Sequence, residues 1–150
     1  CEALYYVNEA LAKMMAGDGE GATALFEVKV VHAASKEDAV ILSKSVCSSS
    51  LVKAAMFGAD ANWGRVICAL GYSGVEFDPE QVDISFKSNE EIFCCKGGKG
   101  LDFDEEKAKS ILLQEEIEII CDMHSGNESC TCWGCDLTYD YVKINGDYRT

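Results

Sequence analysis

The sequence predicts a mixed α/β domain in which helices cover a sheet, with some α+β character. Short stretches of alternating or β-branched apolar residues recur along the chain, amphipathic helical segments separate most of them, and one polar stretch joins two neighbouring strands. Alternation of helices and strands is typical of a sheet packed against helices. The 150 residues, 48% of them hydrophobic, suffice for one domain with a core, or one domain and a piece of another.

Residues 2–16 are predicted to form an amphipathic helix, because their apolar side chains recur on one stripe and good helix formers fill the rest. The stripe consists of Leu4, Val7, Leu11 and Met14 or Met15. Glycines in the loop 17–21 end this helix. Residues 25–31 then alternate and become β-branched, which predicts a strand.

Ser35, followed by an acid three residues later, is a typical helix N-cap and predicts a helix through about Val46. Residues 51–57 are predicted to be a buried strand. Asp60 or Asn62 caps the next helix, which runs to Gly71, and places Trp63 in the core.

The second half of the chain predicts a hairpin, a helix and two further strands. The hairpin strands are residues 82–86 and 92–95, the helix is 104–113, and the last strands are 117–121 and 129–135. The acidic first turn of the helix suits its dipole.

A short helix is expected from about Thr138 to Ile144, with Asp136 or Thr138 as its cap and Gly146 as its end. Leu137, Tyr141 and Ile144 recur at helical spacing. The polar tail beyond this helix is expected to lie inside a pocket.

Charge and composition exclude some classes of protein. A formal charge of -13 argues against binding nucleic acid or an anionic membrane surface. No apolar run is long enough to span a bilayer, and no export signal is visible.

Cys1 is an unusual first residue and indicates the edge of a fragment. The odd number of cysteines, nine, inside apolar runs indicates reduced thiols in a reducing cytosol.

Three motifs carry a family resemblance. They are the runs GDGEGAT at 17–23, LVKAAMFGADANWGR at 51–65 and WGCDLTYDYVKINGDYRT at 133–150. Their order and spacing resemble the glutamate N-acetyltransferase family, also called ornithine acetyltransferases, over the whole chain. The resemblance implies that Glu20, Asn145 and Thr150 bind substrate. Without the resemblance, the glycines would indicate a turn with an exposed Glu. A dinucleotide-binding site is rejected, because it needs a strand before the glycines and here a helix precedes them.

The resemblance also implies an activity and partners. Family members cleave themselves into an alpha and a beta chain, and the N-terminal threonine of the beta chain takes acetyl from N-acetylornithine and passes it to glutamate by a ping-pong mechanism. Oxyanion-hole residues lie on the alpha chain. The expected assembly is an alpha2-beta2 heterotetramer in the cytoplasm, or in the plastid for a plant protein. No cofactor is expected. A bifunctional subset of the family also uses acetyl-CoA as a co-substrate.

On this interpretation residues 1–33 end the catalytic domain, and residues 34–150 form a C-terminal α/β domain with a substrate-binding tail. The fragment lacks the nucleophile, so alone it is expected to be inactive and to hold no catalytic residue. Two alternatives stay open: a non-catalytic small-ligand or partner-binding module, and a zinc-stabilised interaction domain. Zinc would use Cys130, Cys132, Cys135 and His124, but the spacing is unusual, and core packing is favoured over any metal.

Overall fold

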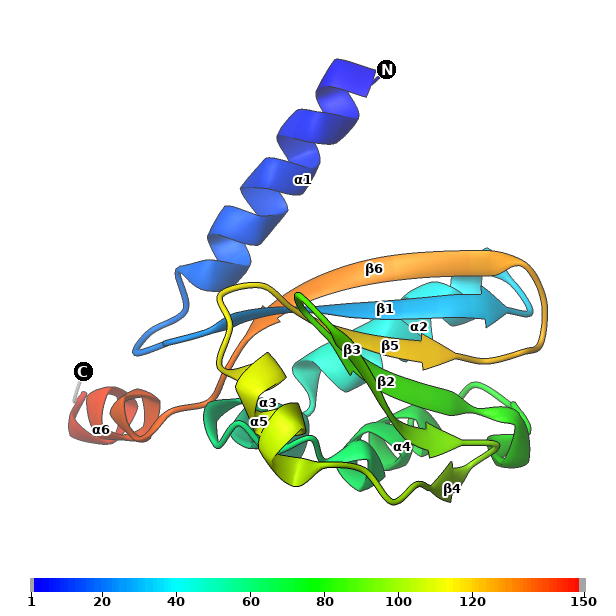
Figure 1. The fold of residues 1–150 in the computed structure, drawn as a ribbon. Coiled ribbons are helices and arrows are strands. Elements are labelled where there is room, and N and C mark those ends of the chain that lie inside the picture. Colours follow the sequence, from blue (N-terminus) through cyan, green and yellow to red (C-terminus); the bar gives the residue numbers. More distant parts are fainter. Residues whose placement is uncertain (1, 149–150) are drawn as a thin grey trace.

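The structure, a computed structural model that describes residues 2–148, contains a six-stranded mixed sheet with helices packed against it (Figure 1). The helices are α1 (Glu2–Gly17), α2 (Lys36–Ser48), α3 (Ser50–Phe57), α4 (Trp63–Gly71), the short 3-10 helix Pro79–Gln81, α5 (Glu105–Leu112) and α6 (Tyr139–Asp147). The strands are β1 (Leu25–Ala33), β2 (Asp83–Lys87), β3 (Glu91–Lys96), β4 (Lys99–Gly100), β5 (Ile117–Asp122) and β6 (Glu128–Cys135). The predicted mixed α/β class is confirmed.

The strand order is β4-β3-β2-β5-β1-β6, so β6 lies at one edge of the sheet. β1 and β5 are parallel, and every other neighbouring pair is antiparallel. Parallel strands need a long crossover connection, which here carries α2 to α5 and the predicted hairpin of β2 and β3. The expected division at residue 33 stays a prediction; β1, which ends there, lies between β5 and β6 in this one sheet.

One hydrophobic core lies between the sheet and the helices α2 to α5. On β1 the buried side chains alternate, as in Phe26 and Val28, which lie opposite Ile117 and Ile119 of β5. Residues directly opposite each other share a face. α2 lies against β1 and β6, while α4 and α5 contact β2. Each fully buried large apolar side chain contributes about 1.5–3 kcal/mol, and this core fixes the sheet.

The predicted strand at residues 51–57 is wrong, because this segment is the helix α3. Ser49 caps it by accepting a hydrogen bond from the Val52 backbone amide. The buried residues Val52, Ala55 and Met56 follow helical spacing, while Leu51 and Phe57 remain exposed. The segment is apolar enough for a buried strand, but its cap and its 3.6-residue period specify a helix.

The first and last helices lie outside the core. α1 has the predicted bounds within one residue, yet it buries no side chain, and Figure 1 shows it projecting from the sheet. α6 buries none either, although Leu137 just before it is half-buried. The expected end at Gly146 is wrong, since the helix continues to Asp147 and the following residue is extended.

Within residues 2–148 no single helix is long and apolar enough to cross a membrane. The bent pair of α2 and α3 meets the length and composition required only when both helices are taken together.

Candidate functional site

The glycine loop that follows α1 holds the beginning of α6. Thr138 donates a hydrogen bond from its hydroxyl to the Gly21 carbonyl oxygen at 2.7 Å, and it accepts one from the Tyr141 amide at 3.2 Å. Thr138, not Asp136, is therefore the cap of α6. Gly21 has φ +68°, and a Cβ there would lie 2.9 Å from the Tyr141 nitrogen. Both facts require glycine at this position.

The same contact brings two of the expected site residues together. Asn145 donates from Nδ2 to Glu20 Oε2 at 2.9 Å and to the Tyr141 carbonyl oxygen, also at 2.9 Å. Glu20 and Asn145 are 125 residues apart in sequence, and both side chains are exposed. The third expected residue, Thr150, lies outside the described residues. Substrate binding by this group stays a prediction.

A buried carboxylate ties the glycine loop to the end of β6. Asp136, only 3% exposed, accepts on Oδ1 from the backbone amides of Thr23 at 2.8 Å and Ala24 at 3.1 Å. Its Oδ2 accepts from the Thr23 hydroxyl at 2.5 Å. A buried carboxylate is stable only when its oxygens are hydrogen-bonded, and these three donors meet that need. Sequence reasoning missed this role, because Thr23 and Asp136 are 113 residues apart.

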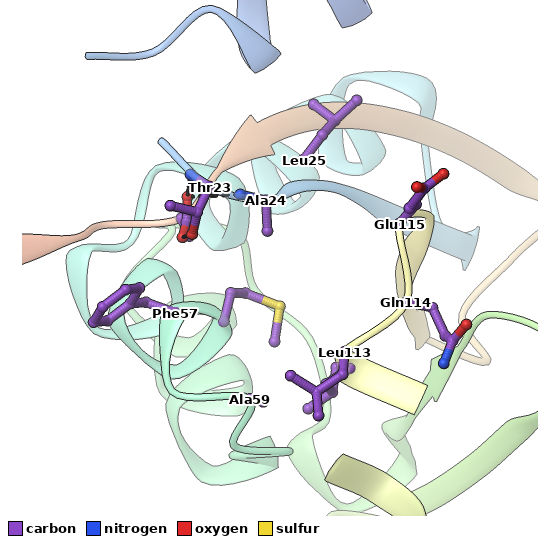
Figure 2. Close-up of a pocket in the computed structure, with 11 residues that line it drawn as sticks. Thr23, Ala24, Leu25, Phe57, Ala59, Leu113, Gln114 and Glu115 are labelled. Carbon is purple, nitrogen blue, oxygen red and sulfur yellow. Dashed lines mark hydrogen bonds between the residues drawn. The ribbon is translucent and has the colours of Figure 1, made fainter. Parts of the chain in front are cut away.

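A cavity of about 340 Å³ opens beside this clamp (Figure 2). Thr23 and Phe57 lie on one side of it, and Leu113, Gln114 and Glu115 on the other. Asp136 and several apolar side chains complete the lining. A small number of polar groups in an apolar cleft is typical of a site for a small molecule.

The two histidines lie far from this loop: His32 is near the opposite end of β1, and His124 is in the turn between β5 and β6. His32 hydrogen-bonds to Asp122 at 2.9 Å, and His124 to Asp83 at 3.1 Å. Both have a left-handed backbone, with φ of 52° and 47°. These pairs connect the ends of neighbouring strands.

The zinc alternative finds no support in the part of the chain that the structure describes. His124 is bonded to Asp83, and Cys130 and Cys132 pack against the core from one face of β6. Among residues 2–148 no three His, Cys, Asp or Glu side chains are grouped so as to hold a metal ion.

Gly21→Ala should destabilise the protein by about 1–3 kcal/mol, because the added Cβ meets backbone atoms of α6 at a positive φ. It should also separate Asn145 from Glu20. Urea unfolding measures the first effect. Gly17→Ala is the matched control, since nothing lies within 4 Å of a Cβ there. Equal stability of the two variants would show that the close approach of the loop to α6 is unimportant.

Comparison with known sequences shows which family this chain is similar to. A family model described as the ArgJ family matches residues 1–150. The arginine biosynthesis bifunctional protein ArgJ 1 of Clostridium acetobutylicum is 57% identical over 150 residues, which are 99% of this chain and 37% of that protein. The glutamate N-acetyltransferase of Methanothermobacter thermautotrophicus is 49% identical over 154 residues, 99% of this chain and 38% of that protein.

Comparison with solved structures gives the same result. The crystal structure of the arginine biosynthesis bifunctional protein argJ from Bacillus halodurans matches with a TM-score of 0.93 and 47% sequence identity. The match covers 98% of this chain and 68% of that one. The chain thus spans about 37% of the length of the curated relatives it matches.

Proposed function

Because the chain belongs to the ArgJ family, we propose that it is the C-terminal part of an enzyme that transfers an acetyl group from N-acetylornithine to glutamate in arginine biosynthesis. The relatives that carry the names bifunctional ArgJ protein and glutamate N-acetyltransferase support this proposal. The observation that carries it is the hydrogen bond between Glu20 and Asn145, because it joins the two motifs for which the family resemblance implies substrate binding.

The geometry supports a particular role for each of these two side chains. Asn145 uses both Nδ2 hydrogens, one of them to orient the Glu20 carboxylate. Glu20 Oε1 and Asn145 Oδ1 then stay available as acceptors for a substrate ammonium group, such as the side-chain ammonium of N-acetylornithine. A charge-assisted hydrogen bond from ammonium to carboxylate is among the stronger polar contacts. Thr150 would add a hydroxyl from the tail.

The chemistry itself is proposed to require the rest of the enzyme. The nucleophilic threonine would accept the acetyl group as an ester, release ornithine, and then pass the group to the glutamate amine. We place this threonine and the oxyanion-hole residues in the segments that complete the alpha and beta chains of an alpha2-beta2 assembly. The exposed apolar side chains of α1 support such a contact: Leu4, Val7, Leu11 and Met14 are each about half or more exposed.

The test is an acetyl-transfer assay on the complete protein and on the 150-residue chain alone. The complete protein should form N-acetylglutamate from N-acetylornithine and glutamate, and the chain alone should not. Replacing N-acetylornithine by acetyl-CoA in the same assay distinguishes a bifunctional enzyme from one that only recycles acetyl groups. Absence of acetyl transfer by the complete protein, or turnover by the chain alone, would contradict the proposal.

A further inference from the structure

A second cavity, of about 540 Å³, opens at the edge strand β6, between α2 and the end of α1. Figure 1 shows α2 running along β1 and β6, on which it packs. Three cysteines line this cavity, Cys47, Cys132 and Cys135, together with two lysines, Lys44 and Lys53. Thiols next to ammonium groups form an environment that favours thiolate. The substrate-binding residues proposed above are not part of this lining.

A close approach of α2 to β6 brings Cys47 to the cavity that Cys132 also lines. A Cβ at Gly134 would lie 2.6 Å from Cys47 Sγ and 3.3 Å from the Cys47 carbonyl oxygen, so glycine lets the helix backbone lie directly on the strand. Cys132 precedes Gly134 by two residues and therefore points to the same face of β6. A disulfide needs Cα atoms about 4.4–6.8 Å apart, which requires such a close approach.

The two thiols have different roles in the pair. A hydrogen bond from the Cys47 thiol lowers the pKa of Cys132 to about 7, helped by the Lys44 charge and the Trp133 backbone amide and opposed by burial. The same hydrogen bond, with burial, raises the pKa of Cys47. These opposite shifts favour the thiolate form at Cys132 rather than at Cys47.

We propose that Cys132 and Cys47 form an oxidant-sensitive dithiol, which a hydroperoxide converts into a disulfide joining β6 to α2. The Cys132 thiolate attacks one peroxide oxygen, the O–O bond breaks, and Cys132 becomes a sulfenic acid while the other oxygen leaves as hydroxide and is protonated. Cys47 sulfur then attacks Cys132 sulfur, the S–O bond breaks, and the Cys47 proton leaves with the hydroxyl as water. With hydrogen peroxide, two thiols lose two electrons and two waters form.

The other cysteines provide internal comparisons. Cys94, Cys95 and Cys121 are buried in the core, and burial raises the pKa of each, to about 12 for Cys94 and Cys121. Cys68 is exposed on α4. The proposal therefore predicts that oxidation begins at Cys132 rather than at the exposed Cys68. Cys135, which lies in the same cavity against Gly19, is the competing partner.

The test treats the full-length protein with limiting hydrogen peroxide, blocks the remaining thiols with an alkylating reagent, and maps the products by mass spectrometry. The expected first product is a peptide linking residues 47 and 132 with the loss of two hydrogens. Cys68→Ser should leave this product unchanged. Cys47→Ser should stop the reaction at a sulfenic acid on Cys132, which a cyclic 1,3-diketone traps.

If a cysteine variant fails to fold, the order of oxidation in the wild-type protein alone still tests the proposal. Oxidation of Cys68 before Cys132 would overturn the proposal, as would a first disulfide between Cys132 and Cys135. Cysteines that all react at similar rates would likewise show that Cys47 and Cys132 are packing residues only.

Discussion

Asp136→Ala should lower the free energy of unfolding by about 2–5 kcal/mol, the largest stability effect that we expect in this chain. The substitution removes the acceptor for the Thr23 and Ala24 backbone amides and for the Thr23 hydroxyl. A buried donor without a partner costs about 1–3 kcal/mol. Since the clamp joins the glycine loop to the end of β6, the loop that carries Glu20 should become more mobile as well.

Two control variants make this experiment specific. Asp136→Asn keeps one carbonyl oxygen for the two amides and should lose about half as much stability or less. Asp102→Ala removes an exposed carboxylate and should change little. Urea unfolding of the purified protein measures all three. If Asp136→Ala unfolds at the same urea concentration as Asp102→Ala, the buried carboxylate has no role in holding the loop.

Asn145→Ala in the complete enzyme should reduce kcat/KM for N-acetylornithine roughly tenfold to a hundredfold, which corresponds to the loss of a paired polar group worth about 1–3 kcal/mol. The variant loses the amide that orients Glu20. The melting temperature should stay nearly unchanged, because the Asn145 side chain is exposed and buries little apolar area. Steady-state kinetics and thermal unfolding together separate this outcome from general destabilisation.

Asn127→Ala is the matched control, because this asparagine is also exposed and lies in the turn between β5 and β6. Deletion of Arg149 and Thr150 should affect kcat/KM as much as Asn145→Ala does, without changing the melting temperature. Wild-type kcat/KM in the tail-deleted enzyme would identify the tail as ordinary surface. It would also remove Thr150 from the proposed site.

Local patterns predicted most elements of this fold. Ser35 and Asn62 cap the helices that they were expected to begin, and the two alternating segments around residues 87–90 form the expected hairpin. The exception is α3, where the mostly apolar residues 51–57 are compatible with a buried strand or with a helix. The Ser49 cap and the burial of Val52, Ala55 and Met56 at helical spacing together select the helix.

For the candidate site, too, some features could be predicted from the sequence and others could not. The family motifs predicted Glu20 and Asn145 individually as substrate-binding residues, because a gapless match of many residues is specific without any structure. Their hydrogen bond, the capping of α6 by Thr138 and the clamp of Asp136 on Thr23 appear only in the folded chain. The pairing of Cys47 with Cys132 likewise depends on the close approach of α2 to β6 at Gly134.

The sequence by itself determined the fold class, the family resemblance and the residues that the resemblance marks as candidates for binding substrate. These follow from periodicity, capping and motif identity, all of which act over a few neighbouring residues. Tertiary structure alone decided which side chains meet. Contacts between residues more than a hundred positions apart depend on strand register and on how closely helices approach the sheet, and no short stretch of sequence encodes either one.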